Sequence, residues 1–297
     1  MTDYLSKYGY MPDGEAIDHS LALIASNLDN MMNERVLKEC FGCMDLTTLK
    51  TNDTAASVEK LVRKVNDFKG SYPEYPLPAS VCVFPNFASV VKNLRNNPEV
   101  HVTVVSACFP SSQSFPEVKL LECRMAVEAG ADEIDIVLAL NSFLAGDYAR
   151  ASEEIAAVRR TVDEAAAAQG RKVLLKVILE TGLLITPENI ANAAFLAMES
   201  GADFIKTSTG KVEVNATPMA AYVMCECIAC SRKSTGRMVG IKPAGGMSTG
   251  KDAACYYSIV ASVLGREWLN KRYFRLGVSR MANNILSVVE QKTVAFF

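Results

Sequence analysis

Residues 133–180 read EIDIVLALNSFLAGDYARASEEIAAVRRTVDEAAAAQGRKVLLKVILE: two apolar runs separated by a long alanine-rich stretch. The runs at 133–139 and 173–180 predict strands, and the stretch between Asp147 or Tyr148 and Gly170 predicts a helix. Near-continuous apolar strands are typical of parallel strands that are covered on both faces. These residues therefore predict a strand–helix–strand unit of an α/β fold.

The same alternation extends in both directions along the chain. Six further candidate strands lie at 41–46, 80–85, 102–107, 204–209, 238–243 and 274–279. Eight strands, each followed by a helix, favour a (β/α)8 barrel, the TIM-barrel architecture. A doubly wound open sheet is the alternative, but its usual glycine-rich first turn is missing from DLTTLKTNDT (45–54).

The N-terminal residues stand apart from this alternation. Residues 1–16 are polar and irregular, and the spacing of Leu21, Ile24 and Leu28 predicts a helix over 17–39. We expect residues 1–40 to form an extension that packs on the barrel as an extra N-terminal helix, placed as a plug at its bottom face. We expect residues 41–297 to form the barrel as a single domain.

Composition limits the classes of function. The 297 residues include 49% hydrophobic and 22% charged side chains, and the net charge is −2. This balance suits a soluble enzyme and gives no electrostatic support for a nucleic-acid partner. No apolar run is long enough to span a bilayer and no secretory signal is recognisable. We therefore expect a cytoplasmic protein with no membrane partner.

Two groups of cysteines invite a metal interpretation. They are Cys40 with Cys43, and Cys225 with Cys227 and Cys230, which fall in one predicted helix. Structural zinc sites place paired cysteines on turns, and no histidine lies near either group. The total of nine cysteines, an odd number, also argues against a disulfide framework. We expect buried, reduced thiols and no metal.

The carboxyl ends of the predicted strands carry most of the titratable chemistry. In chain order they supply Asp45, Cys82, Asp135, Lys176, Lys206, Lys242 and Ser279. In a (β/α)8 barrel these ends meet in one pocket. A lysine held near other cations loses proton affinity and becomes a nucleophile for a carbonyl carbon. The pattern therefore predicts an enzyme that forms a Schiff base.

Each of these side chains also has a structural interpretation. Lys206 is the predicted nucleophile, because it lies in FIKTSTG among small hydroxyl residues, and Lys242 is the cation that lowers its pKa. Asp135 is the predicted general acid/base, although it could instead pair with Lys176 or Lys242. A single lysine at a strand end is usually a solvated rim residue. We expect Cys82 to be a wall of the pocket, since neither histidine is placed as its base.

Three turns after the last strands predict a phosphate site. They are Ser208-Thr209-Gly210-Lys211, Gly245-Gly246-Met247 and Gly277-Val278-Ser279-Arg280. Backbone N–H groups freed by glycine can point at phosphate oxygens, and such barrels often build a phosphate site from their last loops. Lys211 and Arg280 add positive charge.

These motifs resemble those of the deoxyribose-phosphate aldolase family of class I aldolases. The resemblance rests on MDLTTL, EIDIVL, LKVILETG, ADFIKTSTG, GIKPAGGM and RLGVSR, in order from about residue 41 to 285. It implies a (β/α)8 barrel that reversibly cleaves 2-deoxy-D-ribose 5-phosphate to acetaldehyde and D-glyceraldehyde 3-phosphate. It implies no cofactor and, as partners, a small sugar phosphate and aldehydes. A homodimer and a protein partner are both left open.

The resemblance also implies roles for individual residues. Lys206 is similar to the Schiff-base lysine, Lys242 to the lysine that tunes it, and Asp135 to the acid/base residue that moves protons through a water. The substrate-binding residues are expected to be Asp45, Thr47, Cys82, Lys176 and Thr209. The phosphate-binding residues are expected to be Gly210, Lys211, Gly245, Gly246, Ser279 and Arg280.

Two features depart from the family pattern. Arg280 stands where the family usually has a second small hydroxyl residue, and the final residues VAFF lack the tyrosine with which many members end. We therefore expect lower turnover. The departures also favour an alternative, an aldolase-fold protein with weak or no catalysis that serves as a protein-binding scaffold. A transaldolase acting on a longer sugar phosphate is a third hypothesis.

Overall fold

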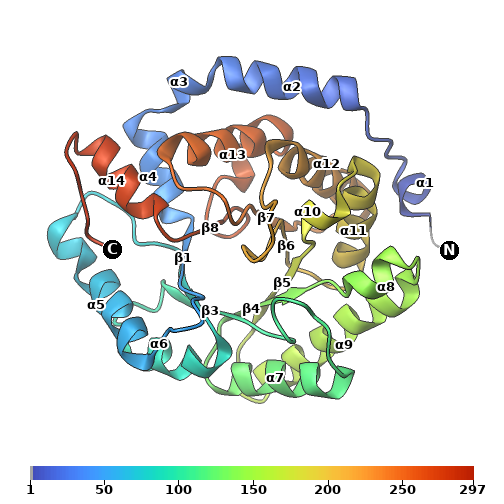
Figure 1. Cartoon of the computed structure of the whole chain (residues 1–297), viewed down its shortest axis with the longest axis horizontal. Helices are drawn as coiled ribbons and strands as arrows, with labels where there is room; N and C mark the ends of the chain where they lie inside the picture. The colour runs from blue at the N-terminus through green and yellow to red at the C-terminus, as the bar shows by residue number, and fades with distance from the viewer. Residues whose placement is uncertain (1–2) are drawn as a thin grey trace.

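Eight parallel strands follow one another around a barrel, and helices surround them (Figure 1). The computed structural model describes residues 3–297. The strands are β1 (Met44–Thr47), β2 (Ser80–Val83), β3 (His101–Val105), β4 (Glu133–Val137), β5 (Leu174–Ile178), β6 (Phe204–Lys206), β7 (Gly240–Lys242) and β8 (Leu276–Val278). Each overlaps a strand predicted from the sequence, so the predicted (β/α)8 barrel is confirmed.

The barrel closes between its last two strands. β8 pairs with β1, and single bridges join Ile241 to Phe274 and Ala244 to Gly277. A Cβ atom at Gly277 would come within 2.7 Å of the Ala244 Cβ atom. Glycine is therefore required at this position, because it lets the two backbones approach closely enough to close the barrel.

The helices begin where the sequence signals them. α5 (Ala55–Ser71) opens with a capping box made by Thr54, and α9 (Tyr148–Ala167) is capped by Asp147. α11 (Pro187–Glu199) and α12 (Pro218–Thr235) each follow a capping threonine with proline in the first turn. The other helices of the ring are α6 (Ala88–Leu94), α7 (Pro116–Glu128), α13 (Gly250–Val263) and α14 (Met281–Val289).

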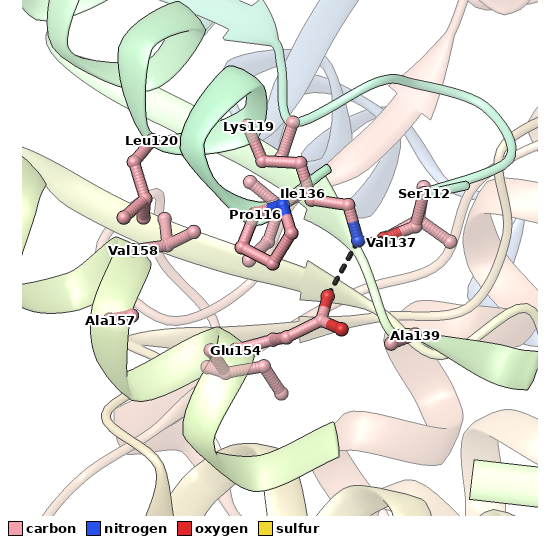
Figure 2. Close-up of a pocket in the computed structure, with 12 residues that line it drawn as sticks. Ser112, Pro116, Lys119, Leu120, Ile136, Val137, Ala139, Glu154, Ala157 and Val158 are labelled. Carbon is pink, nitrogen blue, oxygen red and sulfur yellow. Dashed lines mark hydrogen bonds and ion pairs between the residues drawn. The ribbon is translucent and has the colours of Figure 1, made fainter. Parts of the chain in front are cut away.

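Short helices lie in the connections of the barrel, and an ion pair joins two helices of the ring. Within the strand–helix connections lie α8 (Leu140–Leu144), α10 (Thr181–Leu184) and the 3-10 turn η1 (Pro85–Phe87), and the 3-10 turn η2 (Arg266–Trp268) lies between α13 and β8. α7 and α9 pack against each other and share the buried pair Lys119–Glu154 (Figure 2). Among residues 3–297, no helix combines the length and apolar character needed to cross a membrane.

The N-terminal segment differs from the single helix predicted over 17–39. It forms α1 (Tyr4–Tyr8), α2 (Gly14–Ser26), α3 (Leu28–Met31) and α4 (Glu34–Gly42). Asn27 ends α2, and the Asn33 side chain accepts a hydrogen bond from the Val36 N–H at the start of α4. Asparagine side chains compete with helical backbone bonds and favour helix ends, which explains the breaks.

The first three helices also lie elsewhere than expected. They run along the outside of α11, α12 and α13 and not at the bottom face, whereas α4 packs beside α13 and α14 (Figure 1). Tyr8 stacks on Phe195 with ring centroids 4.1 Å apart, and the Tyr10 hydroxyl donates to Glu226 at 2.7 Å. The segment is therefore fastened to the C-terminal half of the barrel.

Candidate active site

Three lysines meet on one carboxylate inside the barrel. Asp135 Oδ2 accepts from Lys206 Nζ at 3.0 Å and from Lys242 Nζ at 2.8 Å, and its Oδ1 accepts from Lys176 Nζ at 2.7 Å. The strand register places them: Lys206 is aligned with Lys242, and Asp135 with Lys176. All four side chains are buried.

The pKa shifts of these groups run in different directions. Burial would raise the pKa of Asp135, but the three ammonium groups hold it well below its usual range. Burial would lower the pKa of Lys242 and of Lys176, but two carboxylates near Lys242 and three near Lys176 raise it. Burial lowers the pKa of Lys206, and the charge of Lys242 lowers it further, which together outweigh the attraction of Asp135. Lys206 is therefore the lysine whose neutral amine is favoured.

A cavity of about 330 Å³ opens above these charges at the carboxyl ends of the strands. Of the three lysines, only Lys206 lines it. The other predicted site residues that line it are Thr47, Thr209, Gly210, Lys211, Gly245, Gly246, Ser279 and Arg280. Asp45, Cys82, Asp135, Lys176 and Lys242 are not among its lining residues and are buried in the barrel interior.

Comparison with known proteins identifies the family of this chain. The model of the DeoC/LacD family aldolases matches residues 41–255. This chain belongs to that family. A Caenorhabditis elegans protein, provisionally named a deoxyribose-phosphate aldolase, is 36% identical over 276 residues, which is 92% of this chain and 88% of the relative.

Solved structures show the same fold at lower identity. A Toxoplasma gondii protein, provisionally named a deoxyribose-phosphate aldolase, superposes with a TM-score of 0.71 at 23% identity and covers 89% of this chain and 98% of its own. The deoxyribose phosphate aldolase of Aeropyrum pernix, described as having a unique tetrameric structure, gives 0.64 at 21% identity, with 93% and 98% covered. Both likenesses show that this aldolase shares their fold.

Glycine turns form one end of the cavity. Gly210, Gly245 and Gly246 have φ values of 78°, 78° and 75°, in the left-handed region that favours glycine. A Cβ atom at Gly245 would lie 2.6 Å from Asn215 Oδ1, so the turn has no room for a side chain. Lys211 Nζ donates to the Leu49 carbonyl oxygen at 2.6 Å, across the cavity mouth.

Glu180 holds the first of these turns and was missed by the sequence analysis. Its Oε1 accepts from the Thr209 N–H at 3.1 Å and its Oε2 from the Thr209 hydroxyl at 2.5 Å. Glu180 is buried and has a φ of 56°, a strained conformation for a residue other than glycine. The motif LKVILETG contains it, but nothing in that motif indicates a partner 29 residues later.

Cys82 belongs to a small apolar cluster beside the lysines. It packs with Leu49 and Val105, and Phe84 and Phe109 cover the group. Burial raises the pKa of the Cys82 thiol more than the charges of Lys242 and Lys206 lower it. The thiol is therefore protonated at neutral pH. We name these five residues the apolar wall.

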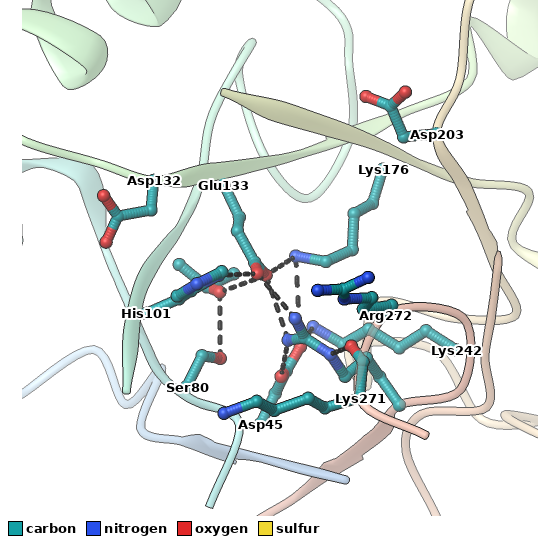
Figure 3. Close-up of polar contacts among 12 residues, drawn as sticks. Asp45, Ser80, His101, Asp132, Glu133, Lys176, Asp203, Lys242, Lys271 and Arg272 are labelled. Carbon is teal, nitrogen blue, oxygen red and sulfur yellow. Dashed lines mark hydrogen bonds and ion pairs between the residues drawn. The ribbon is translucent and has the colours of Figure 1, made fainter. Parts of the chain in front are cut away.

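A second ionic network lies below the first and was not predicted. Arg275 donates to Glu133 Oε1 at 2.7 Å and to Asp45 Oδ1 at 2.6 Å, and Lys176 Nζ lies 2.6 Å from Glu133 Oε2 (Figure 3). Burial would raise the pKa of Glu133, but Arg275 and Lys176 hold it well below its usual range. Asp45 also contacts Lys242 Nζ at 2.5 Å and so joins the two networks.

The predicted helix that carries Cys225, Cys227 and Cys230 is confirmed, whereas Cys40 lies one residue beyond the helix predicted over 17–39. Cys225, Cys227 and Cys230 are on α12, and Cys40 is on α4. Burial raises the pKa of all four thiols. The described residues, 3–297, contain no cluster of histidine, cysteine or acidic side chains arranged to hold a metal ion.

Proposed function

We propose that this aldolase reversibly cleaves 2-deoxy-D-ribose 5-phosphate to acetaldehyde and D-glyceraldehyde 3-phosphate through a Schiff base on Lys206. The observation that carries the proposal is that Lys206, alone among the three lysines, combines a lowered pKa with a place on the cavity wall. A lysine needs both properties to attack a carbonyl carbon near neutral pH.

The first half of the reaction forms the imine. The neutral amine of Lys206 attacks C1 of the open-chain sugar, and the resulting carbinolamine loses water to give a protonated imine. The protonated imine nitrogen carries one N–H, whereas a lysine ammonium carries three. Lys206 can therefore donate fewer hydrogen bonds to Asp135 Oδ2. That oxygen can then accept a hydrogen bond from a water.

The second half breaks the C2–C3 bond. Asp135, acting through water, takes the proton of the C3 hydroxyl as the C3 carbonyl forms, and the bonding electrons move into the imine to give an enamine. D-glyceraldehyde 3-phosphate leaves. Asp135 returns that proton through water to C2 of the enamine, and hydrolysis of the imine releases acetaldehyde and restores Lys206. Lys242 keeps the pKa of Lys206 low in the free enzyme, where the amine must be neutral to attack.

The phosphate of the substrate is proposed to bind at the glycine turns. Gly210, Gly245 and Gly246 leave room for an anion close to the backbone, and Ser279 and Arg280 face the same cavity. Thr47 lines the cavity and is proposed to contact a substrate hydroxyl. Asp45 acts indirectly, because its carboxylate is bound to Lys242 and Arg275.

Borohydride trapping tests the proposal. The protein is incubated with 2-deoxyribose 5-phosphate, reduced with sodium borohydride, digested and analysed by mass spectrometry. We expect an adduct on Lys206, and none on that peptide in Lys206→Met. Lys50→Met, which changes a cavity lysine with no proposed role, is the matched control and should still be trapped. An adduct on Lys176 or Lys242 would overturn the assignment, and no product from folded protein would favour the scaffold hypothesis.

A further inference from the structure

The loop between β3 and α7 has an unfavourable backbone for its sequence. Ala107, Cys108 and Ser112 have φ values of 55°, 62° and 56°, and none of them is a glycine. Residues in this left-handed region persist only where the surrounding structure holds them. Something outside the loop must therefore fix residues 106–115.

Two side chains of α7 reach back to hold this loop. Glu122 Oε2 accepts from the Cys108 N–H at 2.8 Å, and Lys119 Nζ donates to the Ser112 hydroxyl at 3.1 Å. Lys119 in turn lies 2.5 Å from Glu154 Oε2 on α9. Figure 2 shows Ser112, Lys119 and Glu154 converging.

The ion pair lies in apolar surroundings. The small cavity around it is lined by Leu120, Ile136 and Val158, and the Lys119 and Glu154 side chains are 6% and 18% exposed. A buried ion pair is often no more stable than well-packed apolar side chains. The pair is better explained by its positioning effect, because Glu154 fixes the Lys119 ammonium group that binds Ser112.

The loop carries a residue of the apolar wall. Phe109 packs against Leu49, Cys82 and Val105, with its ring 6.4 Å from that of Phe84 in an edge-on arrangement. Cys82 is close enough to Lys206 and Lys242 for their charges to act on its pKa. Of the apolar wall, Leu49 lines the same cavity as Lys206. The wall therefore borders the cavity beside the nucleophile.

We propose that Lys119 and Glu154 are positioning residues for the aldehyde donor. Through Ser112 they hold the 106–115 loop, and the loop holds Phe109 against the apolar wall, which sets the fit of a two-carbon aldehyde beside Lys206. This inference rests on the proposed function. It concerns only the aldehyde end of the substrate, since the glycine turns of the phosphate end lie on β6, β7 and β8 connections.

The test is the double variant Lys119→Met/Glu154→Leu, which removes both charges together and leaves no buried charge unpaired. In the direction of synthesis, we expect the KM for acetaldehyde to rise about ten-fold, the scale on which a loosened apolar pocket loses discrimination. The KM for glyceraldehyde 3-phosphate should stay unchanged. Ser112→Ala, which leaves the ion pair intact, should give a smaller rise in the same direction.

The matched control is Arg160→Met/Glu153→Leu, which removes an exposed ion pair from the same helix. It should leave both KM values unchanged. Hydrogen exchange measured by mass spectrometry should increase at residues 106–115 in the Lys119/Glu154 variant and not in the control. This readout does not depend on activity.

Three outcomes would overturn the inference. One is faster exchange in the loop with an unchanged KM for acetaldehyde, and another is an equal rise in both KM values, as expected of a purely structural pair. The third is unchanged exchange, which would show that the pair does not hold the loop. A wild type that forms no product would instead refute the proposed function, and the exchange result would still decide whether the pair holds the loop.

Discussion

The lower and upper ends of the barrel interior both contain buried acidic and basic side chains, but they differ in the balance of carboxylates and cations. At the lower end, Glu133 contacts both Arg275 and Lys176, and each charge favours the ionised form of its neighbours. At the upper end, Lys206 shares the single carboxylate of Asp135 with two other cations, and its pKa is lowered. The balance of carboxylates and cations within reach, and not burial alone, decides the direction in which the pKa of a buried lysine shifts.

This comparison predicts that upper-end changes affect activity most. In Lys206→Met, we expect turnover of 2-deoxyribose 5-phosphate to fall about 10⁴-fold, as for loss of a covalent nucleophile. The melting temperature should not fall, because the folded state disfavours the Lys206 charge. The comparison would fail if the variant kept substantial turnover, or if it lost stability as a broken ion pair does.

Lys242→Met tests whether a neighbouring cation lowers the pKa of Lys206. Without the Lys242 charge the pKa of Lys206 rises, so a smaller fraction of the amine is neutral at a given pH. We expect kcat to fall about 10³-fold at pH 7, within the range of acid–base and pKa-tuning effects. The acidic limb of the pH–rate profile should move to higher pH, so part of the loss is recovered in alkaline buffer. A limb that stays in place would contradict the proposed role.

Glu133→Gln tests the lower end. Removing one partner from a buried ionic network should lower the free energy of unfolding by about 3 kcal/mol at pH 7, measured with urea. The folded-state pKa of Glu133 is depressed below its unfolded value of about 4.3. Its contribution is therefore complete above that value and is lost as the pH falls through the folded pKa. The difference between wild type and variant should shrink in acid, whereas the exposed control Glu153→Gln should show no difference at either pH.

The smallest effect is expected from removing an exposed arginine at the upper or lower rim of the barrel. Arg280 faces the cavity at the upper rim, and Arg272 precedes β8 at the lower one. In Arg280→Ser we expect the KM for the sugar phosphate to rise about three-fold with kcat unchanged, since an exposed charge is screened by salt. Arg272→Ser should change neither constant. A fall in KM for Arg280→Ser would mean that the guanidinium crowds the phosphate.

Local patterns made much of the fold and upper site predictable. Apolar runs marked all eight strands, and threonine followed by proline marked the starts of α11 and α12. Lys206 and Lys242 come together because parallel strands bring their carboxyl ends to the same edge of the barrel. Lys176 shows the limit of that argument, because it lies within β5 and is fully buried away from the cavity lining.

No local sequence pattern indicated the lower ionic network. Glu133 and Arg275 are 142 residues apart. Glu133 is the first residue of β4 and Arg275 immediately precedes β8, positions where a charged residue is normally solvated. Only barrel closure brings them together. Glu180 was missed for the same reason, because its partner, Thr209, lies after the next strand. The broken N-terminal helix was more accessible, since Asn27 and Asn33 are residues that favour helix ends.

The position of α1, α2 and α3 has a consequence for protein synthesis. These helices are translated before α11, α12 and α13, on which they pack. The hydrogen bond of the Tyr10 hydroxyl can form only after Glu226 has been added, 216 residues later. Vectorial folding during translation therefore leaves this segment without its binding surface while most of the barrel is made. Helices that are translated before the barrel therefore pack in place only after most of the barrel has been made.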